Sequence, residues 1–110
     1  MKYLITESQI DNIIFQYLDN QDFIQYITKE SIYFMNSKGD KYSQIRFEKT
    51  DGRCYVSYDL YNEISMFFSL QDSEFDKVIV KWIENIIKME VESIGVAPSS
   101  GYTLRMPYYN

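Results

Sequence analysis

The 110-residue chain contains no histidine, one cysteine and one alanine. The missing histidine excludes a Ser-His-Asp or Cys-His nucleophile, a histidine general base and an imidazole-ligated zinc site. The single Cys54 can form neither an internal disulfide nor a thiolate cluster, which fits either a reducing compartment or one whose redox state does not matter to the fold. We therefore expect no catalytic residues, no bound cofactor and no metal ligands.

Basic residues and long apolar runs are also scarce. The chain has 11 Lys and Arg against 16 Asp and Glu, a formal net charge of -5, whereas non-specific nucleic-acid binding requires clustered Lys and Arg. Thr6 and Glu7 interrupt the apolar start of the chain, which argues against a signal peptide or a membrane span. We expect a cytoplasmic protein with no direct nucleic-acid partner and no membrane association.

Aromatic residues, in contrast, are abundant, with 11 Tyr and 7 Phe. Residues with A- and T-rich codons dominate the chain, so the base composition of an AT-rich genome would account for this excess. Tyrosine is also enriched at protein interfaces, because its ring buries area while its hydroxyl stays polar. The sequence leaves both explanations open.

Residues 7–19 have the apolar period of an amphipathic helix. Thr6 and Gln9 are spaced as a capping box at its start. The members of its apolar face are Ile10, Ile13, Ile14, Tyr17 and Leu18. We predict a helix over this range that packs through this face.

Two further helices are predicted in the C-terminal half. Residues 60–69 fit a helix with Asp59 as N-cap, although a period of two in the same residues would form a strand, and we favour the helix. The main helix extends from a cap at Asp72 or Ser73 to about Lys88, because its apolar residues recur at helical spacing.

A hairpin is predicted around Asp51-Gly52, because Asp-Gly between two alternating segments is a strong turn signal. The flanking segments are residues 42–49 and 53–58. Pairing across a two-residue loop would place Phe47 opposite Val56, with apolar residues on one face of the sheet.

These elements predict an α+β domain over residues 1–95, followed by a C-terminal tail over residues 96–110. The domain has an N-terminal helix, a three-stranded antiparallel sheet that begins at residues 32–35, and two C-terminal helices. Residues 90–94 alternate like a last edge strand that Gly95 ends. Residues 23–27 fit either a helical turn or an extended link.

Several residue types that serve chemistry elsewhere have structural explanations in this chain. Asp72, Glu74 and Asp76 fall on the first turn of a helix, where negative charge offsets the helix dipole, and the spacing of a calcium loop is absent. Cys54 shares a strand face with apolar residues, and Trp82 lies in the middle of an apolar helix face. We expect both to be core residues.

A carboxylate-based enzyme is an alternative that the sequence allows. Asp59 and Glu63 could line a cleft together with Arg46 and Tyr58 at the open end of the hairpin. Nothing in the sequence fixes a nucleophile or a carboxylate separation there, so solvated helix residues are the simpler interpretation.

Some apolar and aromatic positions have no place on the core faces that the periodicity defines. Apolar residues that lie off the buried helix faces could form a surface for self-association or for a partner. Tyrosines in the hairpin, the second helix and the tail are further candidates. The candidate interface residues are Phe15, Tyr55, Tyr61, Val80, Ile87, Tyr102, Tyr108 and Tyr109. The apolar tail is expected to dock, either on its own domain or on a neighbour.

Four blocks of the sequence resemble a group of small uncharacterised proteins of marine tailed phages and ocean environmental sequences. They are KYLITES (2–8), FQYLD (15–19), YVSYDLYNEIS (55–65) and VIVKWIE (78–84). The resemblance implies a phage or environmental origin, action in the cytoplasm of an infected host, and two helices followed by a strand in the C-terminal half. It implies no activity, because that group has none assigned.

The leading hypothesis is a phage-like accessory protein that acts by protein–protein interaction, without catalysis, on an unknown protein partner or as a homo-oligomer. It rests on the absence of a catalytic set and on the surplus apolar and aromatic positions. Two alternatives are an acidic mimic that inhibits a host nucleic-acid-binding enzyme and the carboxylate-based enzyme described above.

Overall fold

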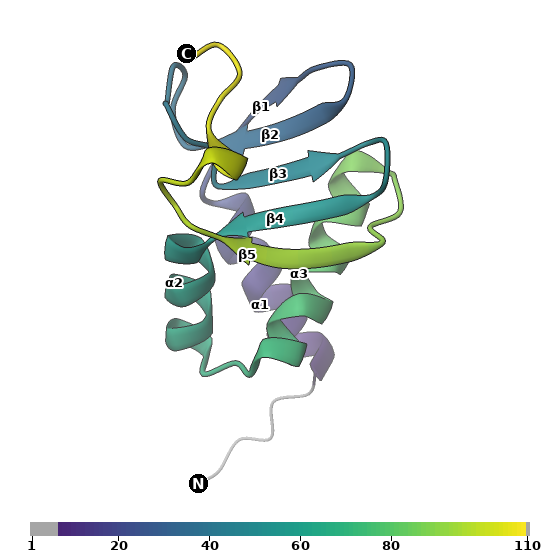
Figure 1. Ribbon diagram of the computed structural model, residues 1–110. Helices are drawn as coiled ribbons and strands as arrows, with labels where there is room; N and C mark the ends of the chain where they lie inside the picture. Colours follow the sequence, from purple (N-terminus) through teal and green to yellow (C-terminus); the bar gives the residue numbers. More distant parts are fainter. Residues whose placement is uncertain (1–6, 110) are drawn as a thin grey trace, which may run out of the picture.

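The computed structural model describes residues 7–109, in which three α-helices cover one face of a five-stranded sheet (Figure 1). The elements are α1 (Glu7–Asp19), β1 (Ile24–Ile27), β2 (Ser31–Met35), β3 (Ile45–Glu48), β4 (Arg53–Ser57), α2 (Tyr58–Phe68), α3 (Asp72–Ile87), β5 (Ser93–Ala97) and the 3-10 turn η1 (Tyr102–Leu104). The α+β class is confirmed. The predicted three-stranded sheet forms only part of a five-stranded one: β1 is an unpredicted strand at one edge, and β5 lies at the other edge, near the predicted last edge strand.

The first added strand is β1, in the region for which a helical turn and an extended link were both open. It pairs antiparallel with β2, from Ile24 opposite Met35 to Ile27 opposite Ile32. Its backbone finds these partners only because β2 lies beside it, so the local sequence alone could not distinguish strand from link.

The strand at the other edge, β5, overlaps the predicted edge strand at residues 93–94; it lies parallel to β4, and α2 and α3 form the connection between them. Parallel neighbours need such a long crossover. The prediction that Gly95 ends this strand is wrong, because Gly95 pairs with Tyr55 in its middle. The strand extends to Ala97, past the predicted domain boundary at residue 95.

The hairpin turn lies at the predicted position, but its register differs. Ile45 is opposite Val56, and Phe47 is opposite Cys54, which is a shift of two residues from the predicted pairing. The connection is longer than two residues and is closed by Gly52 N–H, which donates to the Glu48 carbonyl at 2.9 Å. Because side chains alternate with a period of two, the shift leaves each side chain on its predicted face.

The helices agree with the predicted ranges, but two caps differ. α1 spans the predicted residues, and Thr6 of its capping box lies outside the described residues. Helix α2 is confirmed as a helix, with Ser57 as N-cap in place of Asp59; the Ser57 hydroxyl accepts the Leu60 N–H at 3.1 Å. The strand-to-helix junction has no linker, so the last residue of β4 serves as the cap.

Helix α3 is capped by Gln71, which corrects the prediction of Asp72 or Ser73. Gln71 forms a capping box with Glu74, and the Gln71 N–H donates to the Glu74 carboxylate at 3.2 Å. The Glu74 side chain at N3 thus satisfies the N–H of the N-cap residue, as in a capping box with a shorter N-cap. Asp72 and Glu74, which follow Gln71, therefore lie in the first turn of α3.

The main core fills the space between the helices and the sheet. Its fully buried members include Ile14, Leu18, Phe34, Ile45, Phe47, Val56, Ile64, Phe75, Ile79 and Ile83. Cys54 and Trp82 belong to the same cluster, at 1% and 4% exposed, so both predicted core assignments are confirmed.

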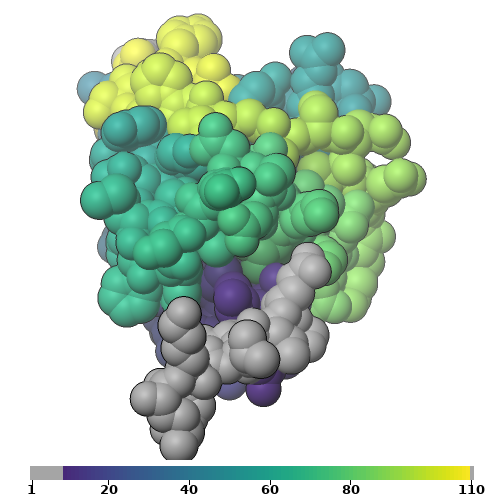
Figure 2. Space-filling view, turned by 90° about the horizontal axis from the view of Figure 1, so that it is seen from below, coloured from purple at the N-terminus to yellow at the C-terminus, as the bar shows by residue number. Residues whose placement is uncertain are grey.

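The tail covers part of the opposite face of the sheet. Met106 packs on Tyr33 and Met35 in a second apolar cluster. The Ser43 N–H donates to the Leu104 carbonyl and the Met106 N–H donates to the Lys41 carbonyl, both at 2.8 Å. In the view from below, the yellow tail and the purple α1 lie on opposite sides of the molecule (Figure 2). The tail therefore docks on its own domain.

Candidate interaction surfaces

Four of the predicted interface residues are half-buried and pack against the main core. They are Phe15 on α1, Tyr61 on α2, and Val80 and Ile87 on α3. The Tyr61 ring centroid lies 4.8 Å from that of Phe75. Phe15, Val80 and Ile87 lie off the predicted buried faces of their helices, but neighbouring elements also cover the sides of each helix. They do not form one exposed patch.

The remaining predicted residues lie on the tail side of the sheet. Tyr55 on β4 is half-buried and lies opposite Arg46. Tyr102 begins the turn η1 and is 88% exposed. Tyr108 and Tyr109 lie further along the tail, at 41% and 42% exposed.

Tyr108 and Tyr109 form an aromatic cluster with Tyr26 of the edge strand β1. The Tyr26 and Tyr108 ring centroids are 5.4 Å apart in a T-shaped arrangement, and those of Tyr108 and Tyr109 are 5.2 Å apart. The Tyr108 hydroxyl donates to the Asp40 carbonyl at 2.6 Å, and the Tyr109 hydroxyl donates to the Gly39 carbonyl at 2.9 Å. Burial, together with nearby negative charge, raises the pKa of Tyr108.

The adjoining strand β1 leaves one edge of the sheet open. All four of its residues are exposed and none is charged; Ile27 is 62% exposed. The Thr28 N–H donates to the Ser31 carbonyl at 2.8 Å. Antiparallel hydrogen bonds alternate along a strand, so the backbone groups of Gln25 and Ile27 face away from β2. An open edge with these properties is a template for pairing with another strand.

A second exposed apolar surface lies where α1 meets the end of α2. Met66 and Phe67 are 73% and 72% exposed, and Ile13 is 47% exposed. The Tyr17 and Phe67 rings stack at 5.9 Å, and the Tyr17 hydroxyl donates to Glu63. The apolar period of the first helix predicted Ile13 in the buried face, and no sequence signal distinguished it from its buried neighbour Ile14.

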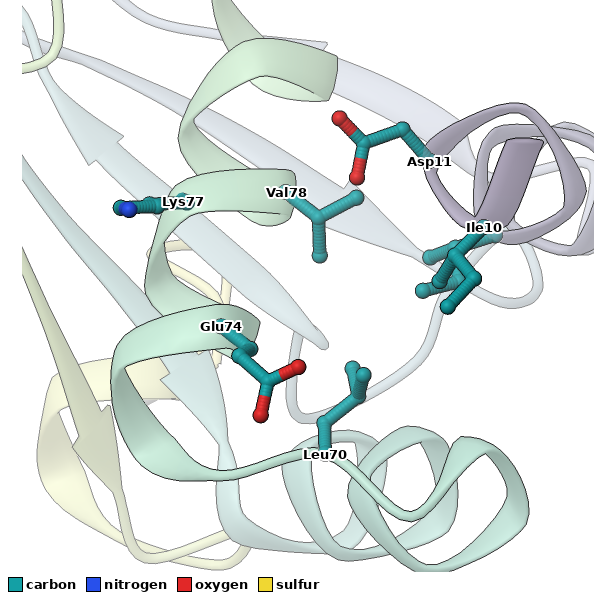
Figure 3. A pocket seen from close by; sticks show the side chains of 7 residues that line it. Ile10, Asp11, Leu70, Glu74, Lys77 and Val78 are labelled. Carbon is teal, nitrogen blue, oxygen red and sulfur yellow. The ribbon is translucent and has the colours of Figure 1, made fainter. Parts of the chain in front are cut away.

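A groove of about 400 Å³ runs between α1 and α3. Ile10, Leu70 and Val78 point into it, with the carboxylates of Asp11 and Glu74 on either side (Figure 3). Both carboxylates have structural partners: Asp11 accepts from Lys81 at 3.1 Å, and Glu74 belongs to the capping box of α3. These partnerships explain both carboxylates without a ligand.

The acidic residues of the first turn of α3 also act locally. Asp72 accepts a hydrogen bond from the Tyr61 hydroxyl, which raises the pKa of Tyr61. Burial and the charge of Asp72 raise the pKa of Asp76. Within residues 7–109, no group of three or more Asp, Glu or Cys side chains is arranged to hold a metal ion.

The carboxylate cleft considered from the sequence is not assembled. Tyr58 and Asp59 line a pocket at the start of α2 together with Val96 to Ser100, but neither Glu63 nor Arg46 is part of it. Arg46 instead pairs with Glu48 on the opposite face of the sheet. Arg46 lies on the tail side of the sheet, whereas α2 packs on the other side against the main core.

No protein-family model matches the chain, and neither a curated protein nor a solved structure matches it. Among the described helices, none combines the length and the apolar character needed to cross a bilayer.

Proposed function

We propose that this protein is a non-catalytic accessory protein that binds another protein by adding a strand to the open edge at β1. The observation that carries the proposal is the combination of outward backbone groups and exposed, uncharged side chains along Ile24–Ile27. Soluble proteins usually protect such an edge with charge, proline or a covering segment. Here the backbone would supply hydrogen bonds, and the neighbouring tyrosines would supply contact area.

The cluster of Tyr26, Tyr108 and Tyr109 extends this surface beyond the strand. Its hydroxyls are held by loop carbonyls, so two of the rings are ordered before a partner arrives. Ordered aromatic side chains lose little entropy on binding and are frequent at the centres of interfaces. Tyr108 and Tyr109 of the tail would therefore contribute contact area to the bound partner.

Gln25 offers a sharp test. Its N–H faces away from β2, so Gln25→Pro removes a donor at the open edge without removing a bond inside the sheet. Gln25→Ala is the matched control, because it changes the same side chain and keeps the N–H. Each variant, immobilised beside the wild type, is exposed to a bacterial lysate, which the resemblance to phage proteins selects as the source.

We expect one protein of the lysate to bind to the immobilised wild type and to Gln25→Ala, and not to bind to Gln25→Pro. Slower amide exchange at Gln25 and Ile27 in the purified complex would support strand addition directly. Phe67→Lys changes the other exposed apolar surface; loss of the partner with this variant alone would move the binding site to α1 and α2. Equal retention by all variants contradicts the proposal. Sedimentation of the wild type and Gln25→Pro distinguishes a second copy of this chain from a different partner.

A further inference from the structure

A pocket of about 320 Å³ lies between the tail and the open face of the sheet. Its lining includes Tyr33, Arg46, Tyr102, Arg105, Met106 and Tyr109. Strands β2 and β3 supply the first two of these side chains, and the tail supplies the others. The volume is at the lower end of the range for small-molecule pockets, which is roughly 300–1,000 Å³.

Charge distinguishes this pocket from the rest of the chain. Among the described residues that line it, two are arginines and none is acidic, although the whole chain has a net charge of -5. The groove between α1 and α3 has the opposite character, with Asp11 and Glu74 in its lining. A positive pocket on an acidic protein concentrates anions locally.

Arg46 is held in this pocket by three contacts. Its guanidinium carbon lies 5.3 Å from the centroid of the Tyr33 ring. Its Nη1 donates to the Thr103 carbonyl at 2.9 Å, and its Nε forms an ion pair with Glu48, which lies outside the lining. Because β3 has a strand on each side, the backbone below this arginine is also fixed.

Arg105 is held by the chain on either side of it. Leu104 and Met106 are both fully buried, and their backbone groups bond to Ser43 and Lys41. The Nε atoms of Arg46 and Arg105 are shielded from solvent. The side chain of Arg46 is therefore held by its own contacts, and that of Arg105 enters the same lining from a fixed backbone.

Glu48 pairs with Arg46 from outside the lining, so no carboxylate of the described lining itself competes with an incoming anion, and both arginines attract an oxyanion that enters the pocket. Arginine presents paired N–H donors that match the oxygens of carboxylate and phosphate groups. Tyrosine rings line the same space and can stack on a planar group. We infer that the pocket binds a small planar organic anion, with its carboxylate or phosphate group between Arg46 and Arg105. The inference is independent of strand addition at β1.

The test is an NMR titration of the full chain with three probes that share a ring: phenyl phosphate, benzoate and neutral phenol. Either or both anions are expected to shift the amide signals of Arg46 and of residues 102–106 and 108–109, with a dissociation constant of about 1 mM or lower. Phenol is expected to leave these signals in place. The anion with the lower dissociation constant shows whether the pocket prefers a phosphate or a carboxylate group. The inference is overturned if neither anion shifts these signals, or if phenol shifts them equally.

Arg105→Gln is the test variant and Arg53→Gln is its matched control. Arg53 has a largely exposed side chain, pairs with Asp51 and does not line the pocket. Loss of one charged donor is expected to weaken anion binding about tenfold or more in Arg105→Gln, with no change in Arg53→Gln. Equal weakening in both variants would show that binding follows overall charge and would reject the pocket. If Arg105→Gln does not fold, Arg46→Lys serves instead, since it keeps the charge and loses the planar fork.

Discussion

The indole N–H of Trp82 donates to Oδ1 of Asp19 at 3.0 Å, which joins the middle of α3 to the last residue of α1. Trp82 is 4% exposed, so loss of the acceptor would leave its N–H without a partner. An unsatisfied donor of this kind costs about 1–3 kcal/mol. We expect Asp19→Ala to lower the free energy of unfolding by this amount, and Asp19→Asn, which keeps an acceptor, to lower it less. Urea unfolding measures both; equal losses would contradict the role of the bond.

The docked tail is expected to stabilise the whole domain through Leu104, which is fully buried. Leu104→Ala should lower the free energy of unfolding by about 2–5 kcal/mol, because it removes buried methyl groups and leaves a cavity. Tyr102, two residues earlier, is 88% exposed, and Tyr102→Ala should change stability by less than about 0.5 kcal/mol. Thermal or urea unfolding tests the contrast. Similar small effects in both variants would mean that the tail does not contribute to the fold.

Stability is expected to fall at high pH because of Cys54. Burial raises its pKa from 9.0 to about 12, and unfolding returns the thiol to its ordinary pKa. Between about pH 9 and 12 the unfolded chain has therefore lost a proton that the folded chain keeps. The unfolded state binds fewer protons, so the free energy of unfolding decreases as pH rises, by up to about 1.4 kcal/mol per pH unit.

Urea unfolding at a series of pH values, with Cys54→Ala for comparison, isolates this contribution. The variant should be less stable near neutral pH, because it leaves a small cavity, but its stability should decline less steeply above pH 9. Parallel declines in the two proteins would show that the thiol does not titrate differently in the folded and unfolded states.

Gly52 closes the hairpin turn with a φ of +73°, and a Cβ there would lie 2.6 Å from Cγ of Glu92. Gly39 has a φ of +88° but nothing within 4 Å of such an atom. Gly39→Ala should therefore cost only the backbone strain, about 1–2 kcal/mol, and Gly52→Ala should cost more. The difference in their unfolding free energies measures the close approach of the turn to Glu92. Equal costs would mean that the Glu92 side chain moves away freely.

The elements that were predicted correctly are those specified by neighbours in sequence. The apolar period of residues 7–19 predicts the first helix, and Asp51-Gly52 predicts the hairpin turn. Both signals lie within a short stretch of chain. Residues 60–69 fitted both helix and strand, and the helix formed because Ser57 provides a cap and Leu60 and Ile64 reach the core. The same local patterns predict core positions for Cys54, on the apolar face of a strand, and for Trp82, on the apolar face of a helix.

The strands at the two edges were missed or misplaced because their partners are distant in sequence. Ile24–Ile27 has no strong alternation and forms β1 only beside β2. The end of β5 follows from its pairing with β4, in which Gly95 lies opposite Tyr55, whereas glycine alone suggested an end. Long-range pairing of this kind outweighs weak local preferences.

The predicted interface residues occupy different places in the fold. Tyr108 and Tyr109, which the core faces do not account for, lie beside the open edge at β1. Ile27 and Phe67 were not selected, because exposure of an apolar residue depends on which elements pack around it. The same limit explains why Phe15 and Val80, which lie off the buried helix faces, are half-buried by neighbouring elements.

Local sequence determined the helices, the position of the hairpin turn and, through the missing histidine, the exclusion of whole classes of catalytic site. Tertiary structure alone decided the five-strand order, the open edge at β1 and the docking of the tail. It also brought Arg46 and Arg105 into one pocket although 58 positions separate them in the chain. The reason is physical: turns and helix faces depend on nearby residues, whereas an exposed edge or a charged pocket depends on which distant segments pack together.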